Sequence, residues 1–311
     1  MKVRPKRLAL VGSLLLAISI WWMLSPGREP RYKGKALSTW LAMDDPYRFM
    51  VNPDDANHYP SFEVVEAVRA IGTNGIPFYL KWLDVRRKPW KDKLLDQVSR
   101  LPGTMALDVF GSRVGSLIWN DGAIGMRAIE GFQILGTNAS CAAPALVHRI
   151  KTAKPPEEAI GPIYALGYIG EEGLPTLMEI LDDKRNADDV RSTAAFAIGY
   201  MPPLGERRRS VVEALVRCLN ENTAASGGAA ASLGNFAAEP DLVVPALIAA
   251  LRNPGFSGHD RVAAALGNFG ESARPAVPAL IEALKYPLPY TVEEATAALK
   301  KIAPEALEQG K

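Results

Sequence analysis

The chain has 311 residues, of which 48% are apolar and 23% are charged, a composition that excludes a disordered or fibrous protein. Its net charge of +2 arises at the N-terminus, because Lys2, Arg4, Lys6 and Arg7 are four of its 36 basic residues and leave 32 against 34 acidic ones. The rest of the chain therefore has no excess of positive charge with which to bind phosphates, and we expect no nucleic-acid partner.

Residues 1–27 are expected to target or anchor the chain. The basic residues precede Leu8–Leu24, a stretch without charge that ends close to Trp21 and Trp22. Its 17 residues lie at the short end of what a membrane-spanning helix needs, and flanking basic residues stay in the cytoplasm. We predict a single-pass signal-anchor helix that places the rest of the chain on the extracytoplasmic, periplasmic side of the cell membrane. A cleaved signal peptide is the alternative, but bulky side chains occupy the expected cleavage site.

Residues 28–60 are expected to combine a short helix with an irregular linker. Leu37, Trp40 and Leu41 recur at the spacing of one helical face, which predicts an amphipathic helix docked on the region that follows. The linker DDPYRFMVNPDDANHYP is rich in residues that favour turns. Its acidic pairs lack the spacing, the glycine and the terminal glutamate of a calcium loop, so we interpret them as solvated loop acids.

From residue 61 to residue 307 the chain is periodic. Segments such as IYALG, AFAIG and AAALG end in glycine at intervals of 64, 31, 32, 35 and 33 residues, the glycines being Gly72, Gly136, Gly167, Gly199, Gly234 and Gly267. A period in the low thirties with helical patterning predicts about six to seven stacked helical hairpins. The first interval is twice as long as the others, which indicates a degenerate repeat near residues 88–122 or, alternatively, an insertion.

Each repeat is expected to contain two helices. The glycine is expected to end the first helix in a left-handed conformation. Proline suits the first turn of a helix and is expected to open the second one, at Pro77, Pro144, Pro175, Pro245 and Pro278. In the last repeat, Thr291 and Glu294 have the spacing of a capping box. We expect the side chains of the second helices to form most of the curved binding surface.

The pattern A-x-A-L-G, a short turn and A-x-P-A-L-x-x-x-L resembles the HEAT-like repeats named after the phycobilisome lyases (PBS lyases). The resemblance covers about residues 61–307 and is best over residues 123–286. It implies an all-α fold, a right-handed α-α superhelix of the HEAT or armadillo type, and it suggests a bacterial protein. It implies little about function, because such repeats carry many unrelated activities.

No catalytic, cofactor-binding or metal-binding residue is predicted, and no cofactor. His58, His148 and His259 lie far apart, outside any zinc motif, and none is followed by glutamate as in the di-iron HEAT-like hydroxylases. The sequence has no phosphate loop and no G-x-S-x-G elbow. Cys141 and Cys218 lie two repeats apart, so we predict two free thiols, with Cys218 buried in a helix.

Two functions remain open. The favoured one is a membrane-tethered scaffold, without catalysis, that binds a protein or peptide partner on its curved surface. The alternative is an enzyme of the HEAT-like lyase type, with its site between residues 37–41, an irregular segment at residues 109–120 and the repeats. The pair His148 and Arg149 is a candidate contact on the concave face, although an ordinary surface pair is favoured. The basic cluster Arg86, Arg87, Lys88, Lys91 and Lys93 is interpreted as solvated surface.

Overall fold

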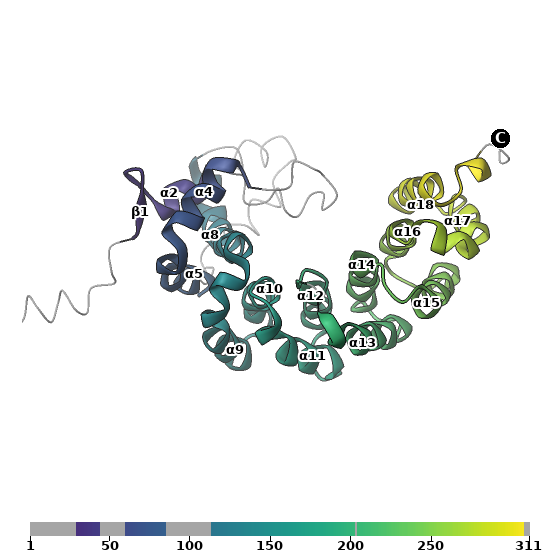
Figure 1. Cartoon of the computed structure of the whole chain (residues 1–311), viewed down its shortest axis with the longest axis horizontal. Helices are drawn as coiled ribbons and strands as arrows, with labels where there is room; N and C mark the ends of the chain where they lie inside the picture. The colour runs from purple at the N-terminus through teal and green to yellow at the C-terminus, as the bar shows by residue number, and fades with distance from the viewer. Residues whose placement is uncertain (1–28, 44–59, 85–112, 203, 308–311) are drawn as a thin grey trace, which may run out of the picture.

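The computed structural model describes residues 29–43, 60–84, 113–202 and 204–307, which form an arc of helices (Figure 1). The predicted anchor at residues 8–24, the acidic linker, His58 and the basic cluster lie outside these residues. Among the described helices, none combines the length and the apolar character that a bilayer crossing requires.

A small hairpin and a short helix lead into the arc. Strands β1 (Arg31–Tyr32) and β2 (Lys35–Ala36) pair in antiparallel register, and α2 (Leu37–Leu41) follows directly. The spacing of Leu37, Trp40 and Leu41 predicts this helix, and all three side chains are buried in it. Helix α2 packs against α4 (Phe62–Ile71) and α8 (Arg113–Leu135), so it covers apolar surface at the N-terminal end of the stack.

Consecutive helices then alternate between two rows. The first helices of the pairs are α4, α8, α10 (Ile160–Tyr168), α12 (Asp188–Gly199), α14 (Ser226–Phe236) and α16 (His259–Asn268). The second helices are α5 (Ile76–Leu83), α9 (Ala143–Thr152), α11 (Leu174–Asp182), α13 (Arg208–Asn220), α15 (Pro240–Arg252) and α17 (Val277–Ala283). Helix α18 (Pro289–Ile302) follows the last pair.

Short 3-10 turns join many of these helices, at η2 (Gly72–Gly75), η3 (Gly136–Ala142), η4 (Pro156–Ala159), η5 (Glu171–Gly173), η6 (Gly205–Arg207) and η7 (Gly270–Ala276), and η8 (Pro304–Leu307) follows α18. Each first helix from α8 to α16 contacts the next first helix, and each second helix from α11 to α15 contacts the next second helix. This stacking confirms the predicted all-α solenoid of helical pairs, in which one continuous apolar core runs between the rows.

The first helices line the inner side of the arc and the second helices line its outer side (Figure 1). The expectation that second-helix side chains form the concave surface is therefore wrong. The reason lies in side-chain size. First helices are rich in alanine and glycine and approach one another closely, whereas second helices carry leucine, isoleucine and valine and stay further apart, so the stack curves toward the first helices.

The long interval between Gly72 and Gly136 does not interrupt the stack. Helix α8 packs directly against both α4 and α5, so the pair that contains α8 follows the α4–α5 pair in space. The residues between Asp84 and Arg113, where the degenerate repeat or insertion is expected, lie outside the described residues. The irregular segment expected at residues 109–120 is helical from Arg113 onward, since α8 continues through Gly115, Gly122, Gly125 and Gly131.

Four of the six repeat glycines are not helix caps, which corrects the prediction for Gly167, Gly199, Gly234 and Gly267. Only Gly72 and Gly136 have positive φ angles, of 59° and 55°. A methyl group on Gly234 would lie 2.6 Å from the Cα of Ala265, and one on Gly267 would lie 3.1 Å from the Cα of Ala298. These glycines are needed because the next first helix touches their backbone.

Two expected helix starts are also corrected. Pro77, Pro144, Pro175 and Pro278 lie in the first turn of their helices, but Pro245 is inside α15, which begins earlier at Pro240. Ala237 and Glu239 adopt left-handed conformations and turn the chain early enough for that start. Helix α18 begins at Pro289, so Thr291 is a buried helical residue and not the N-cap of a capping box.

Candidate binding surface

The inner side of the arc presents one equivalent position from each of the helices α8, α10, α12, α14, α16 and α18, with Lys300 in place of the repeat glycine in α18. This position lies two residues before the leucine or isoleucine that precedes the repeat glycine, and because that residue faces the core, the position faces away from the second helices. All six side chains there are partly exposed. We name this set the inner stripe; it consists of Gln133, Tyr164, Phe196, Ala231, Ala264 and Ala297. The stripe changes along the arc from polar to aromatic and then to small residues.

Arg261 extends across the inner stripe to Phe196. Its guanidinium carbon lies 4.9 Å from the centre of the Phe196 ring, a cation–π contact between α16 and α12. The side chain crosses the intervening helix α14 at Gly227, where a Cβ would lie 3.0 Å from Nη1 of Arg261. Gly227 therefore gives the arginine a path across α14. The arginine reaches from the alanine part of the stripe to its aromatic part.

Tyrosines continue the aromatic part of this surface on α10 and α12. Burial raises the pKa of Tyr164, and the positive charge of Arg261 partly opposes that effect, so the guanidinium influences a phenol on α10. Tyr168 and Tyr200 lie one helical turn further along, with ring centres 5.5 Å apart. Burial also raises the pKa of Tyr168 well above its usual value. Tyr164 and Tyr200 are partly exposed and add aromatic surface, whereas Tyr168, its hydroxyl included, is buried.

Polar side chains occupy the same edge at the C-terminal end of the arc. Asn235, Asn268 and Lys301 take the positions equivalent to Tyr168 and Tyr200, and all three are exposed. Nζ of Lys301 lies 3.5 Å from Oδ1 of Asn268. The inner side thus offers aromatic rings at one part, amides and ammonium groups at the other, and Arg261 between them.

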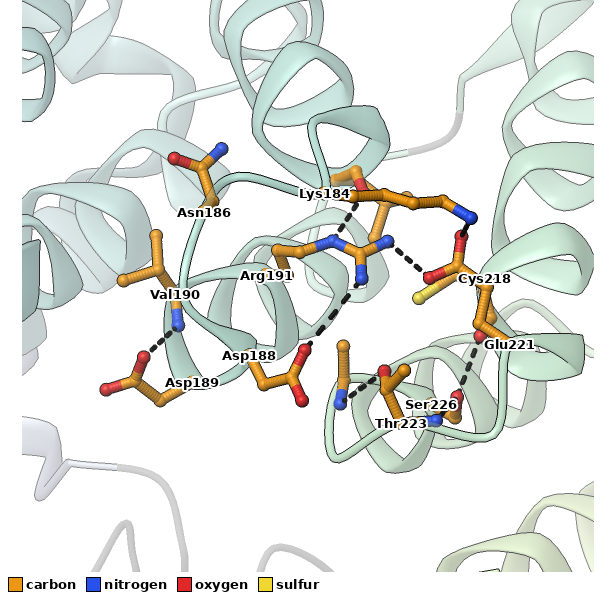
Figure 2. A network of polar contacts seen from close by, with 12 residues as sticks. Lys184, Asn186, Asp188, Asp189, Val190, Arg191, Cys218, Glu221, Thr223 and Ser226 are labelled. Carbon is orange, nitrogen blue, oxygen red and sulfur yellow. Dashed lines mark hydrogen bonds and ion pairs between the residues drawn. The ribbon is translucent and has the colours of Figure 1, made fainter.

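The described residues contain one strongly buried arginine, Arg191, and its contacts hold repeats together (Figure 2). Its Nε donates to the carbonyl of Leu181 at 3.0 Å, and its Nη2 donates to Glu221 Oε2 at 2.7 Å. Lys184 also approaches Glu221, at 3.3 Å. Burial opposes ionisation of Glu221, but the hydrogen bonds and charges of Arg191 and Lys184 outweigh it and lower its pKa. Because the guanidinium at its centre is buried and bonds groups of neighbouring helices, the network is a structural element.

Ser226 and His259, like Arg191, bond a backbone carbonyl near the end of the preceding second helix. The three residues occupy equivalent positions in the first turn of α12, α14 and α16. Ser226 donates to the carbonyl of Cys218 at 2.8 Å, and Nε2 of His259 lies 2.9 Å from the carbonyl oxygen of Asn253. Each bond satisfies a carbonyl at or just beyond the end of the preceding second helix, where helical partners run out. His259 is therefore a buried structural residue.

The other histidine and the cysteines do not contribute to the inner surface. His148 is exposed on the outer helix α9, and Arg149 forms a two-point bond with Asp84, at 2.9 and 2.8 Å. His148 and Arg149 therefore do not lie on the concave face, and that candidate contact is wrong. Cys141 is exposed and Cys218 is buried, and both are free, which confirms the prediction of two thiols. Burial raises the pKa of Cys218 to about 11, so it is a poor nucleophile.

The alternative enzymatic site has one describable side. Helix α2 buries Leu37, Trp40 and Leu41 in an apolar contact with the repeats. Its Trp40 also donates a hydrogen bond from Nε1 to the carbonyl of Tyr32 in β1, at 3.0 Å. In the part of the chain that the structure describes, no three histidine, cysteine or acidic side chains cluster as metal ligands. The side chains of residues 109–120 lie outside the description.

Sequence reasoning missed Tyr164, Phe196 and Arg261. The available signal was their register: Tyr164 and Phe196 stand two residues before the repeat leucine or isoleucine, where later repeats have alanine. An aromatic residue at a partly exposed position that alanine occupies in later repeats could have been singled out. The sequence did not indicate the contact with Arg261, because it joins helices that are not neighbours in the stack.

Comparison with known families identifies one repeat. Residues 260–286 match the family model described as PBS lyase HEAT-like repeat, and the match falls on α16, η7 and α17. No curated protein is significantly similar to the chain. The matched pair packs on its neighbours in the same way as the pairs before it. Residues 260–286 are thus similar to a HEAT-like repeat, and the other described helical pairs stack in the same arrangement.

Proposed function

We propose that this protein is a membrane-tethered scaffold, without catalysis, that binds a segment of a partner protein on the inner side of its arc. One observation carries the proposal: Arg261 of α16 stacks on Phe196 of α12, and its charge partly opposes the rise in pKa that burial causes at Tyr164 of α10, so side chains of three inner-row helices interact with one another. A solenoid builds extended binding surfaces in this manner, because each repeat adds one helix to the same face. Aromatic and arginine side chains are also those enriched at protein interfaces.

Site-specific photo-crosslinking in cells tests the proposal. A photoreactive amino acid at Ala264, in the inner stripe, is compared with the same amino acid at Ala249, an exposed alanine of the outer helix α15. The proposal expects discrete adducts from position 264 and few from position 249. Adducts of equal yield from both positions, or adducts from position 249 alone, would contradict binding on the inner side.

The membrane tether is a separate part of the proposal and rests on residues 1–27. The uncharged stretch Leu8–Leu24 after four basic residues supports it, as does the bulky sequence where a signal peptidase would need small side chains. Alkaline extraction of membranes should leave the full-length protein in the pellet, and deletion of residues 1–27 should release it. A protein that is washed out at alkaline pH, or whose N-terminus begins beyond residue 27, would contradict the anchor.

The orientation of the chain has its own test. Basic residues before the stretch place the repeats on the extracytoplasmic side. Protease added to spheroplasts should therefore digest the repeats, while the same protease added to inside-out vesicles should leave them intact. The opposite pattern would place the scaffold in the cytoplasm.

A further inference from the structure

Arg261 is held in place along the inner stripe. Starting from α16, it crosses α14 at Gly227, with Cδ 3.6 Å and Nη1 3.0 Å from the position of a Cβ on that glycine, and stacks on Phe196 of α12. A long side chain normally samples many rotamers, and fixing it when it binds a ligand opposes binding through the loss of conformational entropy. The aromatic contact fixes the guanidinium before any ligand arrives, so much of that cost is already met in the free protein.

The charge of Arg261 has no acidic partner among the described residues. Most arginines of the stack have one, since Arg149, Arg185, Arg191, Arg207, Arg209, Arg217, Arg252 and Arg274 each lie within ion-pair distance of a carboxylate. Arg261 instead contacts a phenyl ring, which interacts with the face of the guanidinium and accepts none of its in-plane N–H bonds. Its planar edge is therefore available for an acceptor from outside.

The surroundings fit an extended peptide. On the C-terminal side of Phe196 the inner stripe consists of Ala231, Ala264 and Ala297, so the backbone of a bound segment meets no bulky side chain there. On the other side, Phe196 and Tyr164 provide aromatic surface for a neighbouring apolar residue. A guanidinium edge matches the two oxygens of a carboxylate, with which it forms paired hydrogen bonds.

We propose that Arg261, stacked on Phe196, binds an aspartate or glutamate side chain of an extended partner segment, with an adjacent apolar residue of that segment on the aromatic part of the inner stripe. This inference rests on the proposed function and names the chemistry of the partner. The acidic residue supplies the charge that the described structure leaves uncompensated. Specificity arises because the acid and the apolar residue must follow one another in a fixed order along the arc.

The probe is a phage-displayed library of random linear peptides, selected on the purified full-length protein in detergent. Peptides on phage carry carboxylates and no phosphates, so an anion requirement found in this way identifies the carboxylate. The selected peptide and its Asp→Asn or Glu→Gln version are then titrated against wild type, Arg261→Gln and Arg261→Lys. Arg208→Gln, an exposed arginine of the outer helix α13 without an acidic partner among the described residues, is the matched control. Circular dichroism checks that each variant is folded.

The expected result is enrichment of one acidic position next to an apolar one, and a loss of affinity of about tenfold to a hundredfold in Arg261→Gln, the range for a charge-assisted hydrogen bond. Arg261→Lys keeps the charge but loses the planar edge and should recover part of the affinity, whereas Arg208→Gln should bind as wild type does. Replacing the acidic residue of the peptide should cause no further loss of affinity for Arg261→Gln, because the two changes remove the same contact.

Failure of the inference is distinguishable from failure of the proposed function. Peptides that lose binding in Ala264→Trp, which fills the inner stripe, but not in Arg261→Gln, would overturn the carboxylate site and leave the scaffold intact. Peptides that bind equally well to wild type and Ala264→Trp, or a selection without specific peptides, would overturn both.

Discussion

Replacement of Gly234 by alanine tests whether the repeat glycine is a packing residue. Gly234 lies inside α14 without a positive φ angle, so alanine fits its backbone and, in the absence of neighbours, would stabilise the helix by about 1 kcal/mol. A methyl group there would, however, lie 2.6 Å from Cα and 2.8 Å from Cβ of Ala265 in α16. The two contributions have opposite signs, so the direction of the measured change identifies the dominant one.

The size of the effect follows from these distances. Carbon atoms in contact are separated by about 3.5–4.0 Å, so α14 and α16 must move apart by about 1 Å at this point. Overpacking of this kind costs about 1–3 kcal/mol, and the gain in helix propensity offsets about 1 kcal/mol of it. We expect Gly234→Ala to lower the free energy of unfolding by about 1–2 kcal/mol, with the upper half of the range favoured by the rigidity of two opposed backbones.

Equilibrium urea denaturation, followed by far-UV circular dichroism, measures this change. Gly267→Ala should lower the free energy of unfolding by less than Gly234→Ala, because its methyl group would lie 3.1 Å from the Cα of Ala298, further than the 2.6 Å at Gly234. Gly125→Ala is the control, since no atom lies within 4 Å of its Cβ position in the described structure, and should be neutral or stabilising. A stabilised Gly234→Ala variant would refute the packing role and with it the explanation of the curvature.

Three further predictions concern the internal contacts. Arg191→Met should destabilise the protein by about 2 kcal/mol in the same denaturation assay, because it removes the buried guanidinium that bonds the Leu181 carbonyl and Glu221 and leaves Glu221 with Lys184 alone. Arg185→Met, at an exposed pair, should lower stability by less than about 1 kcal/mol, and equal losses in the two variants would contradict the structural role of Arg191. In the native protein a maleimide should label Cys141 rapidly and Cys218 only after unfolding, and two reactive thiols should appear on denaturation without reductant; any protected pair would contradict the stack. The free energy of unfolding should fall as the pH drops below about 4. Glu221 and Asp183 have lower pKa values in the folded chain than in the unfolded one, that of Asp183 being about 2 beside Arg185, so both lose their stabilising contribution when they are protonated. A urea midpoint that stays constant down to about pH 2 would contradict this prediction.

The fold was predictable from the sequence because every repeat recreates the same hydrophobic pattern. Leu247 and Leu280, for example, are buried at equivalent positions of α15 and α17. The role of the repeat glycine was not predictable in the same way. A glycine after an alanine-rich helix suits both a left-handed cap and a close contact with the next helix, and the choice depends on atoms one repeat away, such as those of Ala265.

The candidate surface was harder to predict than the fold. The prediction that second helices form the concave side made His148 and Arg149 candidate contacts, but their helix α9 lies on the outer side. The row in which successive helices lie closer together forms the inner side, and small residues such as Ala194 and Ala197 already indicated that the first helices are the more closely spaced ones. The contact of Arg261 with Phe196 depends on a path across a third helix, which periodicity within one repeat does not describe.

The close contact between Gly234 and Ala265 gives the arc a one-sided stiffness. Backbone atoms of successive inner helices already touch, so bending the arc more tightly would compress atoms at van der Waals distance, where the repulsion rises steeply. Straightening it only separates those atoms, against a shallow attraction, while the wider outer row has room to close. A partner thicker than the opening is therefore accommodated by a wider arc, whereas a thinner partner meets a fixed minimum width.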